Sequence, residues 1–465
     1  MLNSTLLLRT AFALLVLLAA SACGGGGGGG GGGATAPLEA SSDGRRLVEG
    51  AATTPELLLG DAPQSLIVNV SVAQAKTYFS TRQEQGFNAA WVNVLCDPYT
   101  GGRPDATTYD GIAPFDATLS GGLYDLRTPN EVYFQRVDAM VAAAAEHGFH
   151  LWFDPIETGG FLPTLRANGL SAAREYGRFL GRRYQDASNI VWMSGNDFRG
   201  WQDQPSDDEL VFEVAQGIRD EDSRHLHTTE LGDPISSSLD DPRWLPLLGI
   251  NNTYTYAPTY AQLYNDWQRS PFLPNVFIEG NYEGEQLASA PHVTTAEDTR
   301  NEFWWAMTSG AAGAFYGNRW VHDFLSSWQS PLHAAGGEQA KYVRKLLGSK
   351  RWYDLVPDID HDVATAGYGT FKSEINAQDN DFVTTARTPD GRLVLAYFPE
   401  RQSLTIQMTT LSGAATATWF DPTNGASIVD SASPVANAGS HVFTPPPTAH
   451  SDGASDWVLV LEAGP

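Results

Sequence analysis

The sequence is poor in cysteine, in positive charge and in long apolar runs. Its 465 residues contain two cysteines, Cys23 and Cys96, so the fold depends on a hydrophobic core and not on disulfide bonds. The formal net charge of −25 disfavours binding to a nucleic-acid backbone. No Cys/His cluster has the spacing of a structural zinc site, and we expect no metal and no cofactor. After residue 20 no apolar segment is long enough to cross a membrane.

The first residues indicate export. Arg9 precedes an apolar stretch at 10–20, and the small residues after it end at Cys23. This pattern predicts a lipoprotein signal peptide over residues 1–23 with Cys23 as the lipidated residue; an ordinary secretion signal is the alternative. A glycine tract follows, and we assign residues 24–54 to a flexible tether. We expect a protein of the bacterial cell envelope, attached to the membrane only through the lipid on Cys23 and facing the periplasm or the exterior.

Residues 55–350 alternate short apolar runs with longer amphipathic stretches, which is typical of repeated β/α units. Parallel strands are expected near residues 65–70, 88–95, 149–154, 189–197, 225–230, 247–254, 275–279 and 313–318. Helices are expected at 72–85, 132–147, 171–184 and 294–309. Eight such units in roughly 290 residues match a (β/α)8 TIM barrel. The long Gly/Pro/Asp-rich excursion at 97–128 either forms one wall of a substrate cleft or is disordered.

The pattern changes after residue 358. Short β-rich runs alternate with turn residues, of which Asp390 and Gly391 give a strong hairpin signal. The expected strands cover 382–387, 393–398, 404–408, 415–420 and 457–462. The predicted fold class is therefore α/β: a TIM barrel followed by a small antiparallel β-sandwich over residues 358–465.

Two acidic residues end apolar runs in the barrel region. Asp197 follows the fourth predicted strand and Glu279 ends the seventh. The C-terminal ends of barrel strands converge on one mouth, so these carboxyl groups are expected to meet there. Glycoside hydrolysis requires such a pair of acids. For each acid alone, opening a loop or capping a helix is the alternative role.

Other polar and aromatic residues near predicted strand ends are candidates for contacting a sugar. Those that end the first three strands have packing inside the barrel as their alternative role, and tryptophan rings could stack on sugar faces. The candidates for substrate binding are Asn69, Trp91, Asn93, Asp154, Asn196, Glu230, Tyr282, Glu283, Trp201 and Trp320. Among them, Glu230 and Glu283 are the substitutes if either catalytic assignment fails.

Four short stretches carry a family resemblance. They read Gln-Gly-Phe-Asn at 85–88, Tyr-Gly-Arg-Phe-Leu-Gly-Arg-Arg-Tyr at 176–184, Asn-Ile-Val-Trp to Gly-Asn-Asp at 189–197, and Ile-Glu-Gly-Asn-Tyr-Glu at 278–283. Over residues 57–346 the chain resembles the apiosidase-like family, glycoside hydrolase family 140, whose barrel is also called DUF4038. Trp-Phe-Asp-Pro-Thr-Asn-Gly at 419–425 resembles the β-sandwich that follows this barrel, which is catalogued by name as a collagen-binding domain.

The resemblance implies a role for each acid and a substrate class. Asp197 corresponds to the general acid/base and Glu279 to the nucleophile of a retaining hydrolase acting on plant cell-wall glycans, with apiose in pectin as the known sugar. The family's usual Gly-Gly-Asp reads Gly-Asn-Asp here, and such changed flanks leave the sugar open. An oligo- or polysaccharide is the expected partner, and nucleic acid is not. A non-catalytic carbohydrate-binding lipoprotein is the alternative, since it would show the same anchor and aromatic residues.

Overall fold

The computed structural model describes residues 35–96, 103, 105–198, 205–286, 292–375, 377 and 380–464. The predicted signal peptide, the lipidation site Cys23, the glycine tract and Trp201 lie outside the described residues. Within these ranges, no helix combines the length and the apolar character needed to span a membrane.

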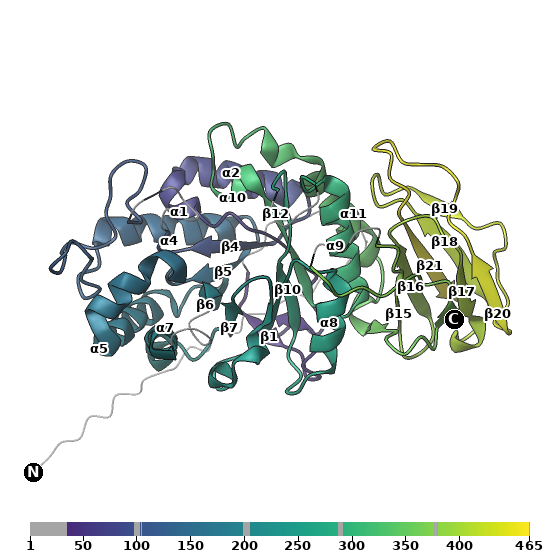
Figure 1. Ribbon diagram of the computed structural model, residues 1–465, viewed down its shortest axis with the longest axis horizontal. Coiled ribbons are helices and arrows are strands. Elements are labelled where there is room, and N and C mark those ends of the chain that lie inside the picture. Colours follow the sequence, from purple (N-terminus) through teal and green to yellow (C-terminus); the bar gives the residue numbers. More distant parts are fainter. Residues whose placement is uncertain are drawn as a thin grey trace, which may run out of the picture. The chain divides into compact units, whose positions relative to one another are not determined.

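Parallel strands of the larger domain form a nearly closed barrel (Figure 1). In the described residues there are eight of them: β3 Leu58–Asp61, β4 Ala89–Asn93, β5 His150–Asp154, β6 Ile190–Phe198, β7 His227–Leu231, β9 Asn251–Thr255, β10 Asn275–Glu279 and β12 Gly313–Asn318. Hydrogen-bonded pairs run from β7 through β6, β5, β4, β3, β12 and β10 to β9. A parallel bridge between His227 and Leu248 links the two ends of this series. The predicted TIM-barrel fold is confirmed.

The first strand was placed wrongly by the sequence pattern. The expected strand at 65–70 is the short helix α1 Leu66–Asn69, and β3 pairs with β4 and β12 instead. A short apolar run is compatible with either a buried helix or a strand, because periodicity alone does not separate the two. In β3, Gly60 lets a neighbouring aromatic ring approach, since a Cβ there would lie 2.4 Å from the Phe315 ring. Asn69 is consequently a helical residue.

Helices cover the outside of the barrel (Figure 1). They are α2 Val72–Glu84, α4 Glu131–Glu146, α5 Thr158–Tyr184, α7 Pro205–Glu221, α8 Thr259–Gln268, α9 Ala296–Thr308, α10 Arg319–His322 and α11 Ala335–Leu347. The capping residues explain several starts: the Asn130 side chain accepts a hydrogen bond at the start of α4, and Thr295 forms a capping box with Asp298 in α9. Within α5, the non-helical backbone of Gly169, with a φ of 73°, divides the span into two helices, and the second begins close to the predicted start at residue 171.

Short elements complete the barrel domain. Between β7 and β9 the chain forms β8 Ile235–Ser237, which pairs antiparallel with β9, and two 3-10 turns in place of a helix. After β10, the two-residue strand β11 Tyr282–Glu283 pairs with β12. The 3-10 turns are η1 Ser238–Asp240, η2 Pro242–Trp244, η3 Pro331–His333 and η4 Trp352–Asp354.

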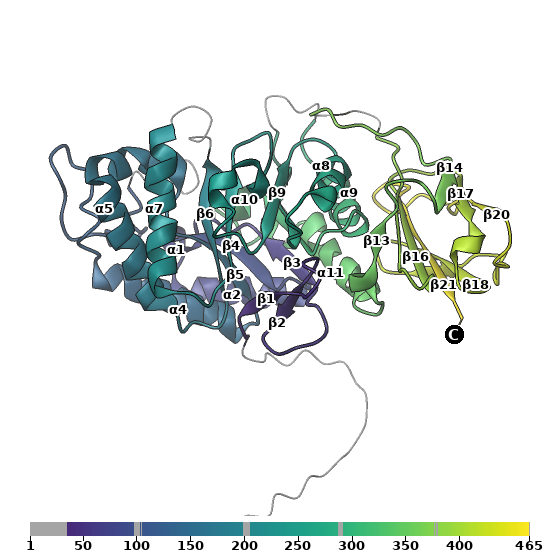
Figure 2. The same ribbon diagram turned by 90° about the horizontal axis from the view of Figure 1, so that it is seen from below.

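The folded region begins earlier than the predicted residue 55. β1 Leu38–Ala40 and β2 Leu47–Glu49 form an antiparallel hairpin within the segment that the sequence assigns to the tether. Figure 2 shows this hairpin beside the barrel strands. Leu38 and Leu47 are buried and join the cluster of apolar side chains that fills the barrel. The hairpin is therefore part of the barrel domain.

The C-terminal domain contains two antiparallel sheets in its described residues, as expected of a β-sandwich. One sheet has the order β13 Val356–Pro357, β15 Thr384–Arg387, β16 Leu393–Phe398, β21 Trp457–Ala463, β18 Ala415–Phe420 and β19 Ser427–Val429. The other has the order β14 Ala364–Ala366, β17 Leu404–Gln407 and β20 Ser440–Phe443, with the turn η5 Met408–Thr410 following β17. Their facing side chains form a separate apolar cluster.

A buried ion pair joins the sandwich to helix α9. Arg300 donates from Nε and Nη2 to the two carboxylate oxygens of Asp456, both at 2.8 Å, and its side chain is only 2% exposed. The Tyr397 hydroxyl donates to the same carboxylate at 3.1 Å. Since these groups are buried and paired, they fix the sandwich against the barrel.

Candidate active site

The C-terminal ends of β6, β7 and β10 bring together three of the predicted acids. Asp197 and Glu279 line one cavity of about 190 Å³. Glu230, at the end of β7, lies next to them and accepts a hydrogen bond from the Asp197 backbone N–H at 3.2 Å. The other residues that line this cavity are Gln64, Asn196, Tyr256, Tyr282, Glu285, Arg319, His322 and Asp323. We call it the catalytic cavity below.

An irregularity in β6 orients Asp197. The pairing of β6 with β7 shifts register between Ser194 and Phe198, and Asp197 has a φ of 49°. This left-handed backbone is uncommon outside glycine, but Asp tolerates it better than most residues. Bulges of this kind often redirect a side chain next to an active site. The strand continues to Phe198, so Asp197 lies within the bulge and not in a loop after the strand.

Burial and mutual repulsion raise the pKa values of the buried acids. The pKa of Glu279 lies well above its usual value because the group is buried and Asp197 is near. The pKa of Glu230 is raised by burial and then by Glu279 and Asp197. Neighbouring carboxyl groups in a buried site do not all ionise together, so the cluster keeps protons at a pH where isolated carboxyl groups have lost them.

A chain of tyrosines reaches Glu279. The Tyr256 hydroxyl donates to Glu279 Oε1 at 3.2 Å and accepts from the Tyr254 hydroxyl at 3.1 Å. A hydrogen bond donated to a carboxylate stabilises its charged form, so Tyr256 opposes the rise in the Glu279 pKa. Tyr256 follows the sixth barrel strand, and the sequence did not single it out.

Two of the expected lining residues pack inside the barrel instead. Trp91 and Asn93 are fully buried, and Trp91 Nε1 donates to Asn93 Oδ1 at 2.8 Å. Asn93 donates to Gln64 Oε1 at 3.4 Å, and Gln64 Nε2 donates to the Tyr282 hydroxyl at 3.2 Å. These side chains therefore support the cavity through Gln64 and Tyr282. Gln64 follows β3, so a correct placement of the first strand would have identified it.

Asp154 supports the bulge without lining the cavity. It ends β5, is fully buried and does not line the cavity. Burial raises its pKa well above the usual value, while hydrogen bonds from the backbone of Ile156 and Gly195 act in the opposite direction. Gly195 belongs to the segment that carries Asp197, so Asp154 positions that segment.

The other candidates lie away from the catalytic cavity. Asn69 donates to the backbone carbonyl of Asp323 at 2.9 Å and is not a lining residue. Glu283 accepts from the Gly336 backbone N–H at 3.0 Å and from a tyrosine hydroxyl, which makes it a structural group. The Trp320 ring packs over Gly284, where a Cβ would meet it at 2.0 Å. The described part of the 97–128 excursion does not line the cavity either.

Charged residues that the sequence did not single out lie at the cavity. Arg319 Nη1 donates to Glu285 Oε1 at 3.4 Å, and His322 Nδ1 lies 2.6 Å from Asp323 Oδ1. The His322 ring also packs edge-on against Tyr282. Throughout the described ranges, no group of three or more His, Cys, Asp or Glu side chains is arranged to hold a metal ion. The carboxyl groups of the cavity offer acid–base and nucleophilic chemistry.

Comparisons with known proteins agree with this geometry. Residues 41–354 match the family described as the apiosidase-like catalytic domain. Residues 372–462 match a family whose description proposes collagen binding for a domain of a collagenase. A search of curated protein sequences finds no match.

Solved structures share the fold across both domains. A glycoside hydrolase is 20% identical, with 92% of this chain and 97% of its own chain covered and a TM-score of 0.76. A glycoside hydrolase family 5 structure from Bacteroides vulgatus is also 20% identical, with 92% and 93% covered and a TM-score of 0.75. The catalytic-domain match spans more than half of the 465 residues. The predicted enzyme class is confirmed, and the chain belongs to the apiosidase-like family of glycoside hydrolases.

Proposed function

We propose that this enzyme is a secreted, lipid-anchored glycosidase that cleaves plant cell-wall or other polysaccharides with retention of configuration. Glu279 is the nucleophile and Asp197 the general acid/base. The observation that carries the proposal is that both carboxyl groups line one cavity at the barrel mouth and interact electrostatically. Apiose is the sugar that the family suggests for this cavity.

The reaction takes two steps. In the first, the Glu279 carboxylate attacks the anomeric carbon while Asp197 gives its proton to the leaving oxygen, so the glycosidic bond breaks as an ester bond to Glu279 forms. In the second, Asp197 removes a proton from water, the water oxygen attacks the same carbon, and the ester bond to Glu279 breaks. The sugar leaves with its original configuration, and both carboxyl groups return to their starting states.

The surroundings favour the required distribution of protons. Since charges on Asp197 and Glu279 repel each other, the pair resists carrying two negative charges at once. The Tyr256 hydroxyl donates to Glu279 and favours the negative charge that the nucleophile needs. Glu230 holds the Asp197 backbone, so its carboxyl group acts as a positioning group.

The test is hydrolysis by the soluble chain without residues 1–33. The substrates are plant glycans, including apiose-containing pectin, and a series of aryl glycosides. Glu279→Gln and Asp197→Asn are expected to abolish release of the sugar that the parent releases. Glu283→Gln is the matched control, because this acid lies just beyond Glu279 but outside the cavity. A parent that binds glycan and releases no sugar would instead be a carbohydrate-binding protein.

A further inference from the structure

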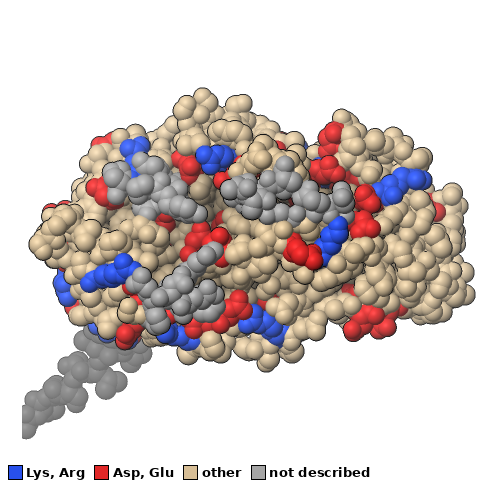
Figure 3. Space-filling model, viewed as in Figure 1, with Lys and Arg blue, Asp and Glu red and all other residues tan. Residues whose placement is uncertain are grey.

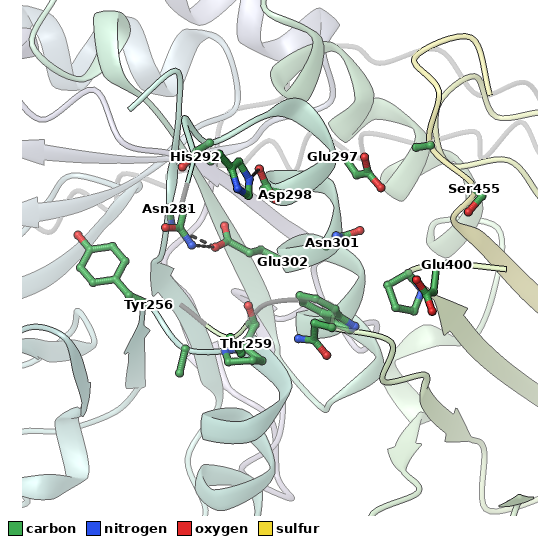
Figure 4. A pocket seen from close by; sticks show the side chains of 18 of the residues that line it. Tyr256, Thr259, Asn281, His292, Glu297, Asp298, Asn301, Glu302, Glu400 and Ser455 are labelled. Atoms are coloured by element: carbon green, nitrogen blue, oxygen red, sulfur yellow. Dashed lines mark hydrogen bonds and ion pairs between the residues drawn. The ribbon is translucent and has the colours of Figure 1, made fainter. Parts of the chain in front are cut away.

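A second cavity lies between the barrel and the sandwich. It measures about 400 Å³ and is lined by the chain after β9 and β10, by helix α9 and by three segments of the C-terminal domain (Figure 4). Tyr256 lines both this space, which we call the interdomain cavity, and the catalytic cavity. The two cavities are therefore neighbours, and the larger one is within the size range of ligand-binding pockets.

The segment after Glu279 borders both cavities. Glu279 lines the catalytic cavity, and Asn281, two residues later, lines the interdomain cavity. Glu302 on α9 holds this segment: its Oε1 accepts from the Asn281 backbone N–H at 3.0 Å and from Asn281 Nδ2 at 2.8 Å (Figure 4). Because Tyr256 lines both cavities, a glycan with one sugar at Glu279 would run past Tyr256 to place its next sugars in the interdomain cavity.

The lining suits hydroxyl groups. Thr259 is 1% exposed, and its hydroxyl has no hydrogen-bond partner among the described residues. Leaving a buried hydroxyl unpaired is unfavourable, and a hydrogen bond to a ligand hydroxyl would remove that cost. Asn301 and Asn380 each accept a tyrosine hydroxyl through Oδ1, and no described residue accepts from their amide nitrogens. Trp305 and Tyr256 contribute aromatic rings of the kind that contact sugar faces.

The charge of the lining disfavours anionic ligands. Three acids, Glu297, Asp298 and Glu400, line the interdomain cavity beside Glu302, whose pKa burial raises to about 8, and no Lys or Arg is found among the described lining residues. His292 also lines the cavity, and its Nε2 lies 2.9 Å from an Asp298 carboxylate oxygen. On the face shown in Figure 3, Lys and Arg side chains stand singly among acidic ones. A uronic acid would meet repulsion in this cavity, whereas an uncharged sugar would not.

The sandwich wall of the cavity is held in place. Asp456, next to the lining residue Ser455, is the acid that pairs with Arg300 of α9. The lining residue Asn301 accepts a hydrogen bond from Tyr397 of β16. Because these contacts cross between the domains and are largely buried, the cavity exists before any ligand binds, which lowers the entropy cost of binding.

We propose that the interdomain cavity binds the uncharged sugar residues that continue from the sugar held at Asp197 and Glu279. The C-terminal domain thereby selects neutral glycan chains over chains that carry uronic acids at these positions. This inference rests on the proposed glycosidase function, which fixes the neighbouring cavity as the place of cleavage.

The experiment measures binding and not turnover. The mature two-domain chain with Glu279→Gln is titrated in a calorimeter with neutral tetrasaccharides from galactan, arabinan, mannan and xylan, and with tetragalacturonate. At least one neutral tetrasaccharide is expected to bind at least tenfold more tightly than tetragalacturonate. In the same background, Thr259→Val is expected to weaken that binding about tenfold, because the unpaired hydroxyl is lost.

A charge-reversed pair of variants tests the selectivity. Glu400→Lys is expected to lower the ratio of the Kd for tetragalacturonate to the Kd for the neutral tetrasaccharide at least fivefold. Glu84→Lys, the same change at an exposed site on α2, is expected to leave this ratio as in the parent. Three results would overturn the proposal. They are equal affinity for tetragalacturonate and all neutral tetrasaccharides, no binding of any of them, and the same affinity ratio in the two lysine variants. Failure of the proposed function would appear separately, as a lack of hydrolysis by the parent enzyme with tetrasaccharide binding unchanged.

Discussion

Replacing Glu302 by Gln is expected to stabilise the protein in mildly alkaline solution. Glu302 is 8% exposed, and burial raises its pKa from 4.5 to about 8 in spite of the hydrogen bonds from Asn281. The folded state therefore holds this proton more tightly than the unfolded state. Below pH 4.5 both states are protonated and the group has no effect, whereas between pH 4.5 and about 8 the unfolded state alone ionises and the free energy of unfolding falls.

The magnitude follows from the two pKa values. Each pH unit in this window lowers the free energy of unfolding by up to about 1.4 kcal/mol, so a shift of about 3.5 units corresponds to roughly 5 kcal/mol above pH 8. Gln keeps an Oε1 that can accept both hydrogen bonds from Asn281 and never ionises. The variant should thus match the parent near pH 5 and exceed it by several kcal/mol at pH 8.5.

Urea unfolding at pH 5, 7 and 8.5 measures the difference between Glu302→Gln and the parent. Glu338→Gln provides a control of opposite sign. Burial acts to raise the Glu338 pKa, but hydrogen bonds from Lys341, Gln85 and His333 lower it to about 2. Its charged form therefore stabilises the fold above pH 4.5, and that stability is lost as the pH falls through about 2, so the control should be less stable than the parent at pH 7. A constant difference between Glu302→Gln and the parent at all three pH values would refute the reasoning.

Three further predictions concern Arg300, Tyr256 and Cys23. Arg300→Met leaves the carboxylate of Asp456 buried and without its main partner, so a loss of about 3–5 kcal/mol is expected in urea unfolding, and the double variant with Asp456→Asn should recover part of it. Tyr256→Phe removes a hydrogen bond to Glu279, so the acidic limb of the pH profile of kcat/KM should move to higher pH; an unmoved limb would separate Tyr256 from the Glu279 ionisation. Cys23→Ala should release the protein from the membrane fraction into the soluble fraction, and retention on the membrane would contradict the lipid anchor.

Strong local patterns predicted most of the fold. The bounds expected for β10 and β12 agree with the structure, because Val-Phe-Ile is an apolar run between Asn and Glu, and Ala-Phe-Tyr is one between two glycines. The first strand was missed because Leu-Ile-Val at 66–68 is as suitable for a buried helix as for a strand. The first strand, β3, packs Gly60 against the Phe315 ring. This contact joins distant parts of the chain, so a local sequence pattern cannot predict it.

The sequence pattern identified the site residues that lie at the ends of strands, but not those in the segments that connect strands to helices. Asp197, Glu279 and Asn196 were found because each lies at the end of an apolar run. Tyr256 stands in a connection whose course depends on the whole barrel, and Gln64 follows a strand that the local pattern misplaced, so neither was selected. Similarly, the glycine tract suggested a tether as far as residue 54, whereas the buried Leu38 and Leu47 place the hairpin within the fold.

Detection of a glycosyl-enzyme tests the roles of Glu279 and Asp197 most directly. In Asp197→Ala, an aryl glycoside with a good leaving group needs no acid for the first step, but hydrolysis of the ester lacks its base. Mass spectrometry after acid quenching should therefore show one added sugar residue, located on the peptide that contains Glu279. A sugar on another peptide, such as the one that contains Glu230, would contradict Glu279 as the nucleophile, and release of product with inverted configuration and no adduct would contradict the double displacement.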